Sequence, residues 1–325
     1  MDLFLPKLIN SNRLQQFFDN KSILNEPIKW ALAERYGIEV VIKREDLLHN
    51  EVSGNKFRKL KYNLIKAKKD KYDTLLTYGG AFSNHIAATA AAGKLFGFKT
   101  IGIIRGDELG VNLEKTLAYN PTLKLAHKYG MQFKFVRRTN YRLKGTDSFS
   151  NNLKNEFGDF YELPEGGTNN LAIKGCEEIL KPKDVNFDYI CVAVGTGGTI
   201  AGIINTSNQK QKILGFSALK GNFLNKNVSM LCNPKNNWKI ITDYHFGGYA
   251  KVSKEFITFI NEFKLETGIA LDAVYTGKMV YGLADLIRKQ YFTRGSKILV
   301  IHTGGLQGNI GMNLFLKKKY KLNLV

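Results

Sequence analysis

The chain has 325 residues, more than one hydrophobic core usually supports, so we expect two domains. A composition of 44% hydrophobic and 23% charged residues excludes general disorder. The formal net charge of +20 raises the possibility of nucleic-acid binding. However, the densest basic runs, 66–71 and 317–321, are short and lack the series of interleaved aromatics that stacks on bases, so we favour a lysine-rich solvated surface without a nucleic-acid partner.

Apolar runs of strand length alternate along the chain with segments of helical periodicity. The predicted strands are 40–42, 74–77, 100–104, 132–136, 189–194, 212–216 and 297–301. The predicted helices are 56–69, 84–96, 113–129, 171–180, 199–205, 254–267 and 280–290. This alternation predicts an α/β fold in which open parallel sheets are covered by helices on both faces.

The order of the elements suggests a smaller α/β domain, 55–160, inserted in a larger one formed by 1–54 and 161–325. Ligands of open α/β sheets bind beyond the carboxyl ends of the strands. We therefore expect the functional site in a cleft between the two domains.

Lys56 is the most informative residue, because it lies in a turn of small residues, Ser53-Gly54-Asn55, directly before a helical run. A lysine held on rigid backbone away from water can lose its proton and attack a carbonyl group. Most lysines are solvated surface charges, so this prediction depends on the other glycine-containing motifs.

A second motif, Gly195-Thr196-Gly197-Gly198-Thr199, follows an apolar strand and opens a helix. Such a turn lets backbone N–H groups approach an anion, and the helix N-terminus adds favourable partial charge. A dinucleotide site would need an acidic residue at the end of the next strand, and 213–220 carries none. The turn therefore predicts a binding site for the phosphate of a small cofactor.

Two further motifs follow predicted strands. Ser83-Asn84-His85 comes after two glycines at the start of a helix, where Ser83 or Asn84 could be an N-cap or could face a substrate carboxylate. His302-Thr303-Gly304-Gly305 ends the last strand, and Tyr275-Thr276-Gly277-Lys278 precedes a predicted helix. A residue at such a turn is well placed to contact a flat ring.

The remaining signals are mainly exclusions. The start of the sequence, 1–6, has no basic segment followed by an apolar stretch, so no signal peptide is predicted, and no apolar run is long enough to span a bilayer. The three cysteines, Cys176, Cys191 and Cys232, are too few and too scattered for a disulfide framework and fit a reducing cytoplasm, with Cys176 and Cys191 expected in the core. The histidines show no metal-ligand spacing, so no metal site is expected.

Together these motifs resemble the family of pyridoxal-phosphate enzymes that contains 1-aminocyclopropane-1-carboxylate deaminase and D-cysteine desulfhydrase. The resemblance extends from Lys43-Arg44-Glu45-Asp46 to His302-Thr303-Gly304-Gly305. It implies the tryptophan-synthase-β-like fold, called fold type II, a homodimer, and a small amino acid as substrate.

The resemblance also implies roles for individual residues. Lys56 would hold pyridoxal 5'-phosphate covalently and then act as the base on the substrate α-carbon. Asn84 would bind the cofactor's 3-hydroxyl group, and Ser83 the substrate carboxylate, with His85 beside them. The loop Gly195, Thr196, Gly197, Gly198 and Thr199 would hold the phosphate. Tyr275 would lie against the pyridine ring, and Tyr249 would be a second active-site tyrosine.

Thr276 and Thr303 favour the desulfhydrase branch. At the two motifs, cyclopropane deaminases have the sequences Tyr-Glu-Gly-Lys and His-Leu-Gly-Gly, with Glu in place of Thr276 and Leu in place of Thr303. Thr303 can offer the pyridine nitrogen only a neutral hydrogen bond, which implies a less electron-poor ring. That suffices when thiolate leaves from the β-carbon, so D-cysteine is the predicted substrate. The alternatives are a cyclopropane deaminase and a non-catalytic protein that binds vitamin B6 or nucleic acid.

Overall fold

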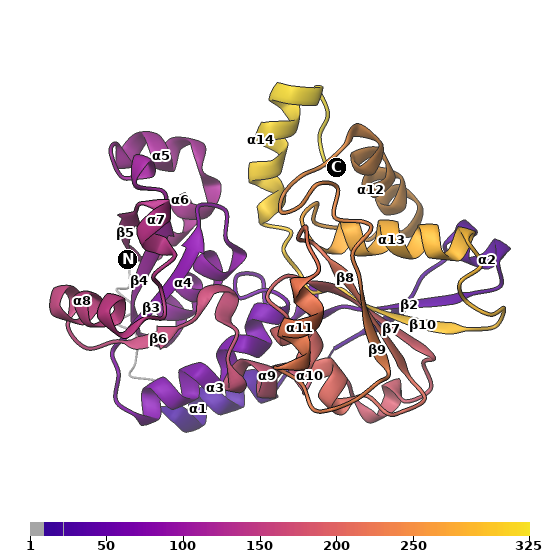
Figure 1. Ribbon diagram of the computed structural model, residues 1–325, viewed down its shortest axis with the longest axis horizontal. Helices are drawn as coiled ribbons and strands as arrows, with labels where there is room; N and C mark the ends of the chain where they lie inside the picture. The colour runs from indigo at the N-terminus through magenta and orange to yellow at the C-terminus, as the bar shows by residue number, and fades with distance from the viewer. Residues whose placement is uncertain (1–9, 22) are drawn as a thin grey trace, which may run out of the picture. The chain divides into compact units, whose positions relative to one another are not determined.

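The computed structural model describes residues 10–21 and 23–325, and the residues in which no signal peptide was predicted, 1–6, lie outside this range. The described chain forms two compact units, which are considered separately (Figure 1). One unit contains residues 10–21 and 59–172, and the other contains residues 23–58 and 173–325. The domain bounds expected from the sequence, at 55 and 161, remain a prediction.

The unit of residues 10–21 and 59–172 is built on a four-stranded parallel sheet with the order β5-β4-β3-β6. Its strands are β3 (Thr74–Gly80), β4 (Lys99–Arg105), β5 (Gln132–Val136) and β6 (Tyr161–Leu163). Its helices are α1 (Ser11–Asp19), α4 (Asn84–Phe96), α5 (Leu113–Tyr119), α6 (Pro121–Lys128), α7 (Arg138–Tyr141) and α8 (Asp147–Phe157), with short 3₁₀ turns η2 (Asp107–Leu109) and η3 (Glu165–Gly167).

Apolar side chains pack on both faces of this sheet. On one face, Ile86 and Ala90 of α4 pack with Leu123 and Ala126 of α6. The cluster on the other face joins strand residues to α7 and α8, and it contains Leu76, Tyr78, Ile101, Ile103, Tyr141 and Leu153. Because neighbouring strand residues point to opposite faces, a strand covered on both sides reads as a nearly continuous apolar run.

The unit of residues 23–58 and 173–325 contains a six-stranded sheet with the order β1-β2-β10-β7-β8-β9, in which only β1 is antiparallel. Its strands are β1 (Asn25–Pro27), β2 (Glu39–Lys43), β7 (Tyr189–Val194), β8 (Lys212–Ser217), β9 (Trp238–Ile241) and β10 (Lys297–Ile301). Its helices are α2 (Ala31–Arg35), α10 (Gly198–Thr206), α11 (Phe223–Ser229), α12 (Lys254–Thr267), α13 (Thr276–Arg288) and α14 (Gly308–Tyr320), with 3₁₀ turns η1 (Glu45–Leu47) and η4 (Pro182–Asp184).

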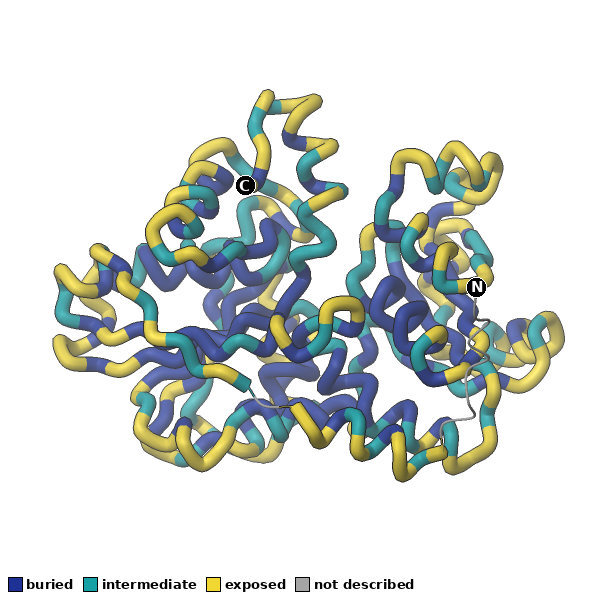
Figure 2. Tube along the Cα trace, turned by 180° about the vertical axis from the view of Figure 1, so that it is seen from behind, coloured by how far each residue is buried: buried dark blue, intermediate teal, exposed yellow. Residues whose placement is uncertain are grey.

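Strand β7 shows how the core of this unit is divided. All six residues of β7 are buried. Figure 2 shows that buried and exposed segments alternate along the whole chain. Cys191 and Ala193 pack with residues of α12 and α13, whereas Val192 and Val194 pack with residues of α10 and α11. Both faces of the sheet are therefore covered by helices, and Cys176 and Cys191 are buried as expected.

Within the described residues the predicted strands and helices are found, but the segment 171–180 is helical only over Asn170–Cys176. The helices α1, α2, α7, α8, α11 and α14 were not predicted. The segment 113–129 is not a single helix, because Asn120 has extended backbone (φ −116°, ψ 97°) and its side chain accepts the Leu123 N–H, so that α6 starts afresh at Pro121. Strands β1, β6 and β9 were not predicted. They are short and carry charged residues or proline, so their sequences give no clear apolar run.

Helices α3 (Asn55–Lys69) and α9 (Asn170–Cys176) each have residues in both units, and the start of α3 belongs with residues 23–58. This start is packed on the loop after β10. A Cβ atom on Gly54, whose φ is +59°, would lie 1.9 Å from the Thr303 carbonyl oxygen, and one on Gly304 would lie 2.7 Å from the Ser53 hydroxyl oxygen. The Asn55 N–H donates to the same Thr303 carbonyl at 3.1 Å.

Gly54→Ala is therefore expected to destabilise the fold beyond the cost of a left-handed alanine. Gly268→Ala is the matched control, because Gly268 has φ +76° and its added Cβ would meet nothing within 4 Å. We expect the control to lower the free energy of unfolding by about 1 kcal/mol, and Gly54→Ala by about 2 kcal/mol more. Urea unfolding of the two variants and the wild type measures both values, and equal losses would contradict the close packing.

Candidate active site

Lys56 lies in the first turn of α3, where its side chain is partly buried. Its Nζ donates to Asn55 Oδ1 at 3.0 Å, and Asn55 Nδ2 donates to Thr199 Oγ1 at 2.9 Å. Asn55 thus connects the lysine to the glycine-rich turn, 144 residues away in the chain. Asn55 was not among the predicted site residues, although its position next to Lys56 was a signal.

The glycine-rich turn connects β7 to α10. Gly197, with φ +90°, is the N-cap of this nine-residue helix and provides no side-chain hydrogen bond to its N–H groups. The backbone N–H groups at the N-terminus of α10 can therefore donate hydrogen bonds to an anion. At the other end of α10, Lys235 Nζ donates to three carbonyl oxygens, those of Ile204, Asn205 and Ser207, at 2.6–3.0 Å.

Tyr275 is the N-cap of α13, and Thr276 is the first residue of this helix, so the helix starts earlier than the predicted 280–290. The backbone N–H groups of Tyr275 and Thr276 donate to the two Asp272 carboxylate oxygens at 2.8 Å each. The buried Thr276 hydroxyl also donates to Asp272, at 2.7 Å. The Tyr275 ring lies beside the glycine-rich turn, since a Cβ on Gly195 would be 3.0 Å from Tyr275 Cε1.

Thr303 follows β10 and is 8% exposed. The preceding residue, His302, is buried and anchors the loop: its Nε2 donates to the Ala270 carbonyl at 2.8 Å, and its Nδ1 lies 3.4 Å from Asp46 Oδ1. Asp46 also accepts from Arg44. His302 Nδ1 accepts the Gly304 N–H at 3.3 Å, so the side chain holds the loop after β10 through Gly304 and Ala270.

Buried ion pairs lie in the same segment. Arg58 Nε donates to Glu45 Oε2 at 2.9 Å, and Lys43 Nζ is 2.8 Å from Asp184 Oδ2, with all four side chains at most 3% exposed. Burial lowers the pKa of Lys43, and Asp184 beside it opposes this shift. Removing one partner would leave a buried charge without compensation, so these pairs hold β2 and the start of α3 in one arrangement.

Tyr249 lies in a loop between β9 and α12 and is 41% exposed. Its ring is 6.2 Å from that of Tyr275, at an interplanar angle of 67°. The residues Lys56, Thr199, Tyr275, Thr303 and Tyr249 all belong to the unit of residues 23–58 and 173–325.

Ser83, Asn84 and His85 belong to the other unit, at the carboxyl end of β3. Ser83 is the N-cap of α4, and its Oγ accepts the Ile86 N–H at 3.4 Å. The Asn84 Oδ1 atom is buried and accepts no hydrogen bond from the described residues. His85 is 1% exposed and packs against Gly167, where an added Cβ would be 2.7 Å from the ring.

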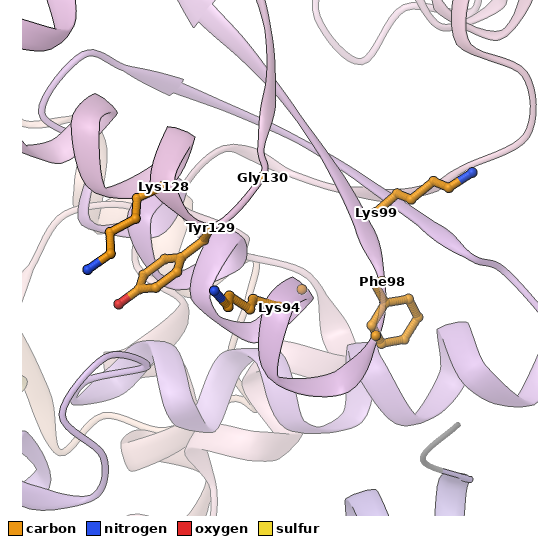
Figure 3. A pocket seen from close by; sticks show the side chains of 8 residues that line it. Lys94, Phe98, Lys99, Lys128, Tyr129 and Gly130 are labelled. Atoms are coloured by element: carbon orange, nitrogen blue, oxygen red, sulfur yellow. The ribbon is translucent and has the colours of Figure 1, made fainter. Parts of the chain in front are cut away.

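A groove of about 460 Å³ in the same unit lies away from these residues (Figure 3). Its lining includes Lys94, Lys99, Lys128 and Tyr129. Lys99 begins β4, so the groove is at the amino ends of the strands, opposite the end that carries Ser83. Lys94 and Lys128 lie in the last turns of α4 and α6, where cations favourably face the helix carbonyls.

Within the described part of the chain, no helix is long and apolar enough to cross a membrane. The same residues contain no group of three or more His, Cys, Asp or Glu that could hold a metal ion.

Residues 23–304 match the family described as "Pyridoxal-phosphate dependent enzyme". The chain is 32% identical over 296 residues to a putative 1-aminocyclopropane-1-carboxylate deaminase of Pyrococcus horikoshii, with 85% of this chain and 87% of that protein covered. It is 34% identical over 296 residues to the Arabidopsis thaliana bifunctional D-cysteine desulfhydrase/1-aminocyclopropane-1-carboxylate deaminase, mitochondrial, with 84% and 73% covered.

The fold matches that of a crystallised homologue of 1-aminocyclopropane-1-carboxylate deaminase. The TM-score is 0.74 at 28% sequence identity, and 91% of this chain and 95% of that chain are covered. These matches confirm the cofactor class and the α/β fold that the sequence motifs predicted. The chain therefore belongs to the pyridoxal-phosphate dependent enzymes, in the fold type II family that contains 1-aminocyclopropane-1-carboxylate deaminase and D-cysteine desulfhydrase.

Proposed function

We propose that the protein catalyses β-elimination from D-cysteine, which with one water gives pyruvate, hydrogen sulfide and ammonia. One observation carries the proposal: Lys56 is joined through Asn55 to Thr199 at the N-terminus of α10. A candidate nucleophilic amine and a candidate phosphate site are thereby linked by two hydrogen bonds. These are the two groups that a covalently held phosphate-bearing cofactor requires.

The residues present fit pyridoxal 5'-phosphate. Gly197, as an N-cap without a Cβ, leaves the N–H groups at the start of α10 open to a phosphate, and the loop Gly195 to Thr199 would hold that group. Tyr275 and Thr303 would contact the pyridine ring. The resemblance assigns Asn84 to the 3-hydroxyl group, and its buried Oδ1 without a hydrogen-bond donor among the described residues supports that assignment.

When bound, the cofactor supplies an electron sink that stabilises negative charge at the substrate α-carbon. Lys56 would remove the α-proton, a general-base contribution of about 10²–10⁴-fold. Ser83, at the N-terminus of α4, would bind the substrate carboxylate with the backbone N–H groups beside it, and His85 is proposed to support this region from its buried position. Tyr249 would border the substrate.

The substrate proposal depends on the threonines. Thr276 cannot replace the glutamate of the cyclopropane deaminase motif as a charged group, and its hydroxyl donates to Asp272. Thr303 would give the pyridine nitrogen a neutral hydrogen bond. Elimination of thiolate, a good leaving group, demands less electron withdrawal from the ring than opening of a cyclopropane. D-cysteine is therefore the proposed substrate, with other β-substituted D-alanines as poorer ones.

A second candidate function is 1-aminocyclopropane-1-carboxylate deamination, because both relatives described above carry that activity in their names. This reaction would release a keto acid and ammonia without sulfide. The homodimer expected from the resemblance and the cytoplasmic location expected from the cysteines are part of the same proposal.

Lys56→Ala is expected to abolish sulfide and pyruvate release from D-cysteine while the chain still folds. The matched control is Lys66→Ala, which removes an exposed lysine of the same helix and should retain wild-type turnover. Borohydride reduction followed by mass spectrometry should place the cofactor on Lys56 in the wild type. Turnover by Lys56→Ala at the wild-type rate would refute the assignment. Keto acid release from the cyclopropane acid alone would favour the second candidate.

Thr303→Val is expected to change the visible absorbance of the bound cofactor and to weaken its binding about 5–10-fold, which corresponds to one lost hydrogen bond of about 1 kcal/mol. Thr206→Val is the control, because the Thr206 hydroxyl bonds only to carbonyls of α10 itself in the described structure. Absorbance spectra and equilibrium titration with pyridoxal phosphate measure both effects. Identical spectra for both variants and the wild type would show that Thr303 does not face the ring nitrogen.

A further inference from the structure

Lys278 is a buried lysine to which the family resemblance assigns no role. It lies in the first turns of α13, two residues after Thr276, and is 1% exposed. Its Nζ donates to the His245 carbonyl at 2.9 Å and to the Gly248 carbonyl at 2.7 Å. Burial lowers the pKa of Lys278 to about 8, because removal from water disfavours the charged form.

The loop that accepts these bonds, residues 245–250, has an unusual backbone. Phe246 and Ala250 have φ values of +53° and +55°, in the left-handed region that side chains other than glycine rarely adopt, and Gly247 and Gly248 are also at positive φ. Such a conformation persists only where surrounding contacts hold it. Phe246 is one anchor, because its ring stacks on Phe256 at a centroid distance of 4.3 Å.

Lys278 is the second anchor. The Gly248 carbonyl that it binds directly precedes Tyr249, whose ring approaches that of Tyr275. Without Lys278, two carbonyl oxygens beside a buried position would lose charge-assisted donors. The contacts thus run from Lys278 through the loop to Tyr249, and from Tyr249 to Tyr275 at the glycine-rich turn.

We propose that Lys278 is a positioning residue that holds loop 245–250 and thereby fixes Tyr249 beside Tyr275 for substrate binding. The substrate part of this inference rests on the proposed function. Lys278 itself touches neither substrate nor cofactor in this proposal. It acts through the position of Tyr249, so its loss should affect KM more than kcat.

The first test compares Lys278→Met with the wild type by amide hydrogen exchange, with the cofactor bound. Methionine has a similar length and no donors, so exchange in peptides covering 245–250 is expected to accelerate about 10-fold or more. Lys254→Met, which removes an exposed lysine at the start of α12, is the control and should leave this exchange unchanged. Equal exchange in all three proteins would overturn the proposal.

The second test is a double-mutant cycle on the KM for D-cysteine, using Lys278→Met, Tyr249→Ala and the double variant. Lys278→Met should raise KM about 10-fold, with kcat changed about 3-fold or less and with borohydride labelling of Lys56 retained. If Lys278 acts through Tyr249, the double variant should match Tyr249→Ala alone. The proposal would be overturned if the KM increases of the two single variants multiplied in the double variant, or if Lys278→Met left KM unchanged.

If Lys278→Met does not fold, Lys278→Arg carries the same comparisons, because it keeps the charge but changes the geometry of the donors. A wild-type chain that binds pyridoxal phosphate but turns over neither D-cysteine nor the cyclopropane acid would refute the proposed function. Hydrogen exchange would in that case still decide whether Lys278 holds the loop, so the two failures are distinguishable.

Discussion

The approach of Gly54 to the Thr303 carbonyl is the constraint on which the candidate site depends. At Gly54 the backbone of the lysine turn lies directly against the Thr303 carbonyl, and the Asn55 N–H donates to the same carbonyl. The backbone positions of Lys56 and Thr303 are therefore set by contacts between backbone atoms and not by the conformations of side chains. Because protein interiors respond to the addition of a single methyl group, such a contact tolerates little change.

Buried ion pairs also hold the segment that contains the lysine turn, although removing their charges from water costs free energy. Arg58 with Glu45 and Lys43 with Asp184 lie around the segment that carries the lysine turn. A buried pair adds little net stability compared with well-packed apolar residues, but breaking one costs about 3–5 kcal/mol. Such pairs favour one arrangement of the segment over its alternatives. Lys278 and the loop 245–250 extend the same principle to the second tyrosine, where a buried cation and positive-φ backbone are retained together.

The ends of helices α10 and α13 provide further polar groups at the candidate site. Among the described residues, no side chain caps the N-terminus of α10 at the glycine-rich turn, while Lys235 binds carbonyls at its other end. Asp272 binds the first N–H groups of α13 and so fixes Tyr275. The polar groups of these two helix ends are directed either to a local side chain or to the place where an anion is proposed to bind.

The sequence alone determined the alternation of strands and helices, because apolar periodicity and strand length are local properties, and it singled out Lys56 and the glycine-rich turn by their local spacing. The break at Asn120 was missed although its signal is local, an asparagine N-cap followed by a proline at the first position of α6. Only the tertiary structure decided the roles of Asn55 and Lys278. Asn55 and Lys278 bond to groups 144 and 30–33 residues away, and such partners are set by how the strands order in the sheet, which no local pattern encodes.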